Sequence, residues 1–341
     1  MTGRDPHQGA REDRGASARR GNGRSFEATL TRRSMLRSLG MVGLGTIASA
    51  CSGGASVRTS PAGSLAALEE HASQISMIGA GTPVNPGKQT ISFFLLKGQS
   101  VLANATASVW MAKDQSSKAA GPFPAAWYPL LGYAQTHDTS PQSPLAVGVY
   151  SVDVDFPSAG IWTLACEVTS GSVRSVGTQA VPVTDAAVVA ALGSKAMSVP
   201  TPVASTLHGL EAICTRQPPD HMHYISLEDA LRNGKPTVIC FATPLLCQSQ
   251  TCGPTVDEQL LVFEHYGAGR ANFIHVEEFL PGPDLTPPPA TPKNLSPSFK
   301  AWGFIDEPWV IVIDAKGVIR ARLGPGVAAA QQIDAALSPL L

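Results

Sequence analysis

The chain has 341 residues, of which 43% are hydrophobic and 15% are charged, and its net charge at pH 7 is −1. This length and composition indicate a folded globular protein with two domains. The near-neutral charge, and the lack of a basic stripe with interleaved aromatic residues, argue against a nucleic-acid-binding role. We therefore expect no nucleic-acid partner.

The N-terminal residues 1–50 are predicted to direct export. Their first 30 residues are polar and rich in Gly and Arg, which predicts disorder. Arg32 and Arg33 then precede an apolar stretch over 39–50, which is shorter than the about 20 residues of a membrane-spanning helix. Twin arginines before such a run resemble a twin-arginine export signal.

The end of this segment, Ala48-Ser49-Ala50-Cys51, resembles a lipobox. If it is used, the mature chain begins at a lipid-modified Cys51 and is anchored at the outer face of the cytoplasmic membrane. Cleavage near Ala50 would instead release a periplasmic or extracellular protein. Residues 51–85 begin with a Ser- and Gly-rich stretch and are predicted to be a tether.

Residues 86–185 are predicted to form a β-sandwich. Short strands are expected at 90–96, 105–111, 147–154, 162–168 and 172–181. Their spacing and the turn residues between them are typical of such a fold. The segment 148–162 resembles a hairpin of immunoglobulin-like domains from bacterial envelope proteins, which implies an immunoglobulin-like sandwich. The stretch 114–144, rich in Pro, Ser and Ala, is expected to be a surface loop.

Residues 186–222 are predicted to be a linker, and 223–341 a second domain. A short helix is expected after the N-cap residue Ser226, ending at Gly234. Further elements follow in the order strand, helix, strand, helix, strand, strand, helix. They are expected at 237–242, 256–263, 271–276, 298–302, 307–314, 318–322 and 328–341.

Two cysteines, Cys247 and Cys252, lie where the first of these strands leads into the long helix. The first amides of a helix are unpaired and carry partial positive charge. A thiol placed there is stabilised as the thiolate, which is both the nucleophile and the metal-binding form. This position therefore favours redox chemistry or metal binding.

This region, from Ile225 to Leu341, resembles the thioredoxin-like superfamily. The matching features are Cys252-Gly253-Pro254 at a strand-to-helix junction and Pro308 at the start of a later strand. The resemblance implies an α/β thioredoxin-like fold, with Pro308 in the cis form beside the reactive cysteine. The chain departs from the family because Thr255 stands where the second cysteine is expected, so that the second thiol is Cys247.

The leading hypothesis is thiol–disulfide exchange, with Cys252 as the attacking thiol and Cys247 as the resolving thiol. No cofactor is then needed, and the partners would be thiols or disulfides of envelope proteins, or a membrane redox partner. Two alternatives remain at this point. The pair can be a structural disulfide, or the domain can be a non-catalytic binding module beside the sandwich.

A copper site is a further alternative. The Sco family resembles this arrangement, with a thioredoxin fold, two cysteines at the same junction and a distant histidine, although three residues separate its cysteines rather than four. The corresponding ligands here would be Cys247, Cys252 and His275, since thiolate and imidazole suit copper. His221 and His223 are a second possible source of imidazole.

Three cysteines remain after Cys51 and the pair are assigned. Cys240 lies inside an apolar strand and is expected to be an unpaired, buried residue. Cys166 and Cys214 are hypothesised to form a disulfide that joins the two domains in an oxidising compartment.

Overall fold

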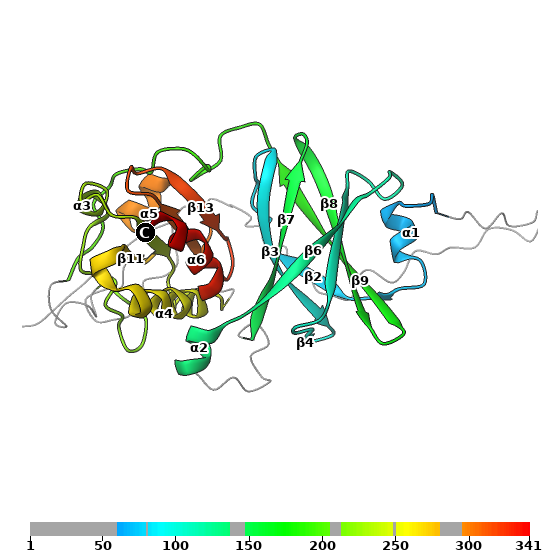
Figure 1. The fold of residues 1–341 in the computed structure, drawn as a ribbon, viewed down its shortest axis with the longest axis horizontal. Coiled ribbons are helices and arrows are strands. Elements are labelled where there is room, and N and C mark those ends of the chain that lie inside the picture. Colours follow the sequence, from blue (N-terminus) through cyan, green and yellow to red (C-terminus); the bar gives the residue numbers. More distant parts are fainter. Residues whose placement is uncertain (1–59, 80, 137–146, 205–212, 248–249, 280–294) are drawn as a thin grey trace, which may run out of the picture. The chain divides into compact units, whose positions relative to one another are not determined.

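The computed structural model describes residues 60–79, 81–136, 147–204, 213–247, 250–279 and 295–341. Arg32, Arg33 and Cys51 lie outside these residues, so the predicted export signal and lipid anchor do too. Among the described residues, no helix is long and apolar enough to cross a membrane. The described chain is mostly β and contains two sheets (Figure 1).

The first sheet has nine strands, and two short helices lie in the same part of the chain. The strand order is β1-β9-β8-β5-β6-β7-β3-β2, and β4 pairs with β3. The bounds are β1 Ser73–Gln74, β2 Ser76–Gly79, β3 Gly87–Lys97, β4 Ser100–Val101, β5 Ala107–Ala112, β6 Ala120–Pro129, β7 Gly148–Phe156, β8 Gly160–Ser170 and β9 Val173–Val183, with helices α1 Leu65–Glu69 and α2 Leu131–Thr136.

This sheet encloses one hydrophobic core and is sandwich-like. Inward-facing residues of β3 and β7, such as Phe93 and Tyr150, belong to the same buried cluster as Leu164 and Val181 of β8 and β9. The five strands that the sequence predicts are β3, β5, β7, β8 and β9. Burial alternates along the first part of β5 and over Val152–Phe156 of β7, as expected for strands with one face on the core.

The loop expected over 114–144 was wrong, because β6 and α2 lie within it. Prolines in β6 hid the strand, since proline removes a donor from the ladder. The structure accommodates them because β6 changes neighbour along its length. Residues 120–125 pair with β5 and residues 125–129 pair with β7, so each half has one side without a ladder partner.

The second sheet has four strands in the order β11-β10-β12-β13. Strand β10 is parallel to β11 and antiparallel to β12, which forms a hairpin with β13. The elements are α3 Leu227–Ala230, β10 Thr237–Phe241, α4 Cys252–Arg270, β11 Asn272–Val276, α5 Pro297–Trp302, β12 Trp309–Ile313, β13 Ile319–Leu323, α6 Ala330–Leu337 and a 3₁₀ turn at Ser338–Leu340. They follow the predicted order.

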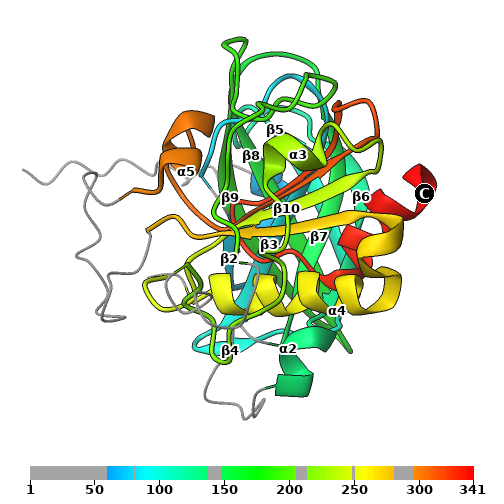
Figure 2. The same ribbon diagram turned by 90° about the vertical axis from the view of Figure 1, so that its left-hand side faces the viewer.

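Helices cover both faces of this sheet (Figure 2). Alternate residues of β10 face opposite layers. Val238 and Cys240 pack with residues of α4 and α6, whereas Ile239 and Phe241 pack with residues of α3 and α5. Every residue of β10 is buried. Burial on both faces explains why this strand reads as a continuous apolar run rather than as an alternating one.

The predicted linker 186–222 ends in a buried segment. Residues Cys214, Asp220 and Met222 are at most 1% exposed. The backbone N–H of His275 in β11 donates to the carbonyl of Met222, at 2.9 Å. Segment 213–223 is therefore attached along the outer edge of β11, where it adds side chains to the interior of the α/β part.

Ser226 precedes α3 as predicted, but its side chain does not cap the helix. Instead its Oγ accepts a hydrogen bond from the Thr201 N–H, at 3.0 Å, and Thr201 Oγ1 accepts one from the Leu227 N–H, at 3.0 Å. The Thr201 hydroxyl oxygen thus accepts from the first N–H of α3, and the Ser226 hydroxyl in turn fixes the backbone of Thr201.

Candidate functional site

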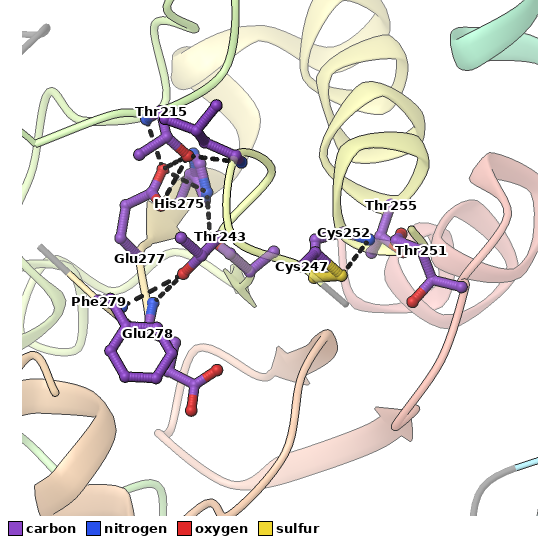
Figure 3. The surroundings of a disulfide bond; sticks show 12 residues. Thr215, Thr243, Cys247, Thr251, Cys252, Thr255, His275, Glu277, Glu278 and Phe279 are labelled. Atoms are coloured by element: carbon purple, nitrogen blue, oxygen red, sulfur yellow. Dashed lines mark hydrogen bonds and ion pairs between the residues drawn. A yellow bond between two sulfur atoms is a disulfide. The ribbon is translucent and has the colours of Figure 1, made fainter. Parts of the chain in front are cut away.

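Cys247 and Cys252 form a disulfide, with their Cα atoms 5.9 Å apart (Figure 3). This separation is within the normal range for bonded cysteines. Cys252 is the first residue of α4, and its backbone N–H donates to Cys247 Sγ at 3.3 Å. Four intervening residues therefore suffice to close the bond, as the sequence analysis allowed.

The two sulfurs differ in their access to solvent. Cys252 is fully buried in the cluster that also holds Val238 and Val256, whereas Cys247 is only partly buried against that cluster. An incoming thiol can therefore reach Cys247 but not Cys252. This order of access is the reverse of the one assumed in the sequence analysis, where Cys252 was the attacking thiol.

Hydrogen bonds around the first turn of α4 hold Cys252 at the start of the helix. Thr251 precedes the helix, and its carbonyl accepts hydrogen bonds from both the N–H and the hydroxyl of Thr255, at 3.1 and 2.9 Å. Pro254 lies in the first turn, where a missing N–H costs no helical hydrogen bond. Thr255, at the usual position of the second cysteine, is buried and bonded within the helix.

Glu307 is a member of this site that the sequence analysis missed. Its carboxylate and the sulfurs of Cys247 and Cys252 all lie within 4.8 Å of one another. The peptide bond between Glu307 and Pro308 is cis, as the family resemblance implied for Pro308. Glu307 Oε2 is buried and has no hydrogen-bond partner among the described residues. In the sequence, the only sign of this role was the position of Glu307, an acidic residue directly before Pro308.

Glu307 lies close to a second carboxyl group, that of Glu278. Burial, and then the charge of Glu278, raise the pKa of Glu307 to about 8. Burial raises the pKa of Glu278 to about 7. Thr243 supports both groups, since its Oγ1 accepts from the Glu278 N–H at 2.7 Å, and its hydroxyl lowers the pKa of Glu307 in part (Figure 3). This pair therefore holds a proton near neutral pH, beside the disulfide.

His275, the third ligand of the copper alternative, is grouped with other residues. Its Nδ1 lies 2.7 Å from Asp220 Oδ2 and 3.8 Å from Cys214 Sγ, and its Nε2 lies 2.9 Å from the Ala242 carbonyl. Within the described residues, the atoms that cluster around the disulfide are those of Glu307, not of His275. The attachment of segment 213–223 to β11 accounts for this placement.

Charge stabilises the His275–Asp220 pair. Burial opposes the charged form of each group, but the charge of the other group and the hydrogen bond between them outweigh it. The pKa of His275 therefore lies well above its ordinary range, and the pKa of Asp220 lies well below its own.

Cys166, Cys214 and Cys240 are free and buried. The prediction for Cys240 is confirmed, and burial raises its pKa to about 12. The hypothesised disulfide between Cys166 and Cys214 was wrong. Cys166 lies in the core of the nine-stranded sheet, whereas Cys214 Sγ lies 3.2 Å from Asp220 Oδ2 in the α/β part.

No protein-family model matches this chain, and a search of curated proteins also gives no match. Among solved structures, the chitinase ChiW of Paenibacillus sp. str. FPU-7 is 14% identical over 33% of this chain and 8% of its own length, with a TM-score of 0.18. The human F-spondin reeler domain is 15% identical over 34% of this chain and 97% of that domain, with a TM-score of 0.20. The PKD domain of the human receptor SorCS2 is 15% identical over 41% and 95%, with a TM-score of 0.18. TM-scores of this size carry no argument about this chain.

Proposed function

We propose that residues 223–341 form a thioredoxin-like domain that carries out thiol–disulfide exchange on proteins of the cell envelope. The observation that carries this proposal is the disulfide between a partly exposed Cys247 and a buried Cys252 at the start of α4. The strand order β11-β10-β12-β13 with helices on both faces, and the cis bond before Pro308, support the same family. The envelope location rests on the resemblance of Arg32-Arg33 and the following apolar run to a twin-arginine signal, and of Cys51 to a lipidation site.

The difference in burial assigns the roles of the two cysteines. In the reduced protein, the Cys247 thiolate attacks one sulfur of a partner disulfide and bonds to it, and the other partner sulfur leaves as a thiolate. The Cys252 thiolate then attacks Cys247 Sγ, which releases the second partner thiolate and closes the Cys247–Cys252 bond. Two electrons have then passed to the partner. Oxidation of a partner dithiol is the same sequence in reverse.

The helix terminus and Glu307 serve the second of these steps. A thiolate at Cys252 is stabilised by the partial positive charge at the start of α4. Because Cys252 is fully buried, water cannot take up the proton of its thiol directly, and a proton acceptor nearby is needed. Glu307 lies within reach of both sulfurs, and a carboxyl group with a pKa of about 8 exchanges protons near neutral pH. Its assigned role is to accept the Cys252 proton as the disulfide closes.

Reduction of a small aromatic disulfide by the mature chain, with a dithiol present to reduce the Cys247–Cys252 bond after each cycle, tests this proposal through the release of the coloured thiolate. We expect turnover by the wild type and at least ~100-fold loss in both Cys247→Ser and Cys252→Ser. The Cys252→Ser variant should accumulate a mixed disulfide at Cys247, since it lacks the resolving thiol. The buried Cys166→Ala variant, in the other sheet, is the matched control and should retain turnover.

Two results would contradict the proposal. No turnover above background in the wild type would make the bond a structural staple, and the domain a binding module. A mixed disulfide trapped at Cys252 in the Cys247→Ser variant would refute the assigned order, because the buried sulfur would then be the one that partners reach.

A further inference from the structure

A second group of chemically active side chains lies buried in the α/β part, apart from the disulfide. It consists of Cys214, Asp220 and His223 from segment 213–223 and His275 from β11. One ligand atom of each lies within 4.8 Å of the others, and each residue is at most 1% exposed. A thiol, a carboxylate and two imidazoles are rarely buried together unless each of them has a hydrogen-bond partner or a metal ion to bind.

The hydrogen bonds of His275 identify which of its nitrogens faces the group. Nε2 lies 2.9 Å from the Ala242 carbonyl, which can only accept, so Nε2 carries a proton. Nδ1 therefore faces Asp220 Oδ2 at 2.7 Å and Cys214 Sγ at 3.8 Å. A lone pair directed at a carboxylate over this distance is repulsive unless a cation, either a proton or a metal ion, lies between them.

A proton on Nδ1 would satisfy His275 and Asp220 but not His223. The His223 side chain is 1% exposed, and neither of its ring nitrogens makes a hydrogen bond to a described residue. Its Nε2 lies 3.5 Å from Asp220 Oδ1. This contact is long, and a buried polar group left without a good hydrogen bond costs about 1–3 kcal/mol. One metal ion would give His223 a partner and would join it to Cys214, whose Sγ already lies 3.2 Å from Asp220 Oδ2.

A cysteine–histidine–aspartate catalytic relay does not fit these contacts. Such a relay needs the thiol and the carboxylate on opposite nitrogens of the imidazole. Here Cys214 and Asp220 both face Nδ1 of His275. The Cys214 side chain is also fully buried, so no substrate can reach its sulfur.

We propose that Cys214, Asp220, His223 and His275 bind a divalent metal ion, best matched by zinc, in a closed structural site. Zinc is bound in proteins by cysteine sulfur, histidine nitrogen and aspartate oxygen, and structural zinc sites have four protein ligands in a tetrahedral arrangement. Tetrahedral coordination at ordinary bond lengths separates ligand atoms by roughly 3.3–3.6 Å. Cys214 Sγ lies 3.2 Å from Asp220 Oδ2 and 3.8 Å from His275 Nδ1, and His223 Nε2 lies 3.5 Å from the other carboxylate oxygen, Asp220 Oδ1. The 2.7 Å contact between His275 and Asp220 is the one that the metal lengthens.

The groups around the ligands fit a metal site. His275 donates its second ring N–H to a backbone carbonyl, the usual arrangement for a metal-binding histidine. Asp220 Oδ1 accepts from the Met222 N–H at 2.9 Å, which fixes the carboxylate. The metal would join segment 213–223 to β11. Since neither Cys247 nor Cys252 is a ligand, the site stands independently of the proposed redox function.

The test is metal binding by the mature chain. Because the site is buried, the protein is unfolded with a chelator and refolded with Zn²⁺ or Co²⁺, and bound metal is then measured by elemental analysis. We expect one equivalent in the wild type, and the cobalt form should show a thiolate-to-cobalt charge-transfer band with tetrahedral d–d bands. His223→Gln should weaken binding at least ~100-fold. Cys214→Ser, which is nearly isosteric, should remove the charge-transfer band.

Three controls make the result specific. His265→Gln changes an exposed histidine of α4, Cys166→Ala removes a buried cysteine of the other sheet, and Cys247→Ser with Cys252→Ser removes the disulfide. All three should retain one equivalent of metal. The proposal is overturned if the refolded wild type binds none, if His223→Gln and Cys214→Ser bind as the wild type does, or if the double variant loses the metal.

Discussion

Substitution of Glu307 by Gln should change how the stability of the protein depends on pH. A carboxyl group whose pKa is raised in the folded state binds its proton more tightly there than in the unfolded chain. The free energy of unfolding of the wild type therefore falls as the pH rises from the ordinary value of 4.5 to about 8. Gln has nearly the same shape and does not titrate, so Glu307→Gln lacks this contribution.

The size of this change in the free energy of unfolding follows from the pH interval between the two pKa values of Glu307. From 4.5 to about 8, at ~1.36 kcal/mol per pH unit, the upper limit is ~5 kcal/mol. Glu307 is only partly buried and shares its proton with Glu278, so solvent screening and coupling reduce the effect. We expect the variant to gain about 2–3 kcal/mol relative to the wild type between pH 5 and pH 8.5.

Urea unfolding of the oxidised protein at a series of pH values measures this difference. Glu264→Gln, on an exposed position of α4, is the matched control and should follow the wild type at every pH. Parallel curves for Glu307→Gln and the wild type would refute the reasoning, because the carboxyl group would then titrate alike in the folded and unfolded chains.

Two further predictions concern burial. In the reduced protein, a bulky alkylating reagent should modify Cys247 at least ~10-fold faster than Cys252, as peptide mapping can measure; equal rates would contradict the order of access. Arg216→Ala should lower the free energy of unfolding by about 3–5 kcal/mol, because Asp257 would lose the partner of a buried ion pair with an N–O distance of 2.7 Å. The exposed-pair control Arg232→Ala should cost under about 1 kcal/mol, and equal losses in urea unfolding would refute this account.

The elements of the α/β part were predictable because their signals are local. Strand β10 is a short run that is apolar after Thr237, and the Cys252-Gly253-Pro254 sequence marks the start of α4. Pro308 marks the beginning of β12 in the same way. Each of these signals depends on neighbouring residues only, so a single sequence suffices to read it.

The side chains that gather around the two sites were harder to predict because they come together through the tertiary fold. Cys214 and Asp220 are 61 and 55 positions from His275 in the chain, and only the attachment of segment 213–223 to β11 joins them. Glu307 reaches the disulfide from a different loop. Strand β6 was missed for another reason, since its prolines oppose a strand locally and its change of neighbour removes that conflict.

The access of the two cysteines also depends on packing that no spacing reveals. Cys252 belongs to the helix that packs on β10, so its side chain is buried in the core. Cys247 lies in the loop before the helix and stays partly exposed. The position of Cys252 before Gly-Pro indicated its helix terminus correctly, but it did not determine which sulfur faces solvent.

A glutathione redox titration of the mature protein, with differential alkylation and mass spectrometry of Cys247 and Cys252, tests the proposed exchange most directly. We predict that the pair interconverts between dithiol and disulfide with a midpoint between about −120 and −270 mV, the range of catalytic dithiols. A pair that stays oxidised below roughly −300 mV would contradict the account, because a bond that resistant to reduction is structural.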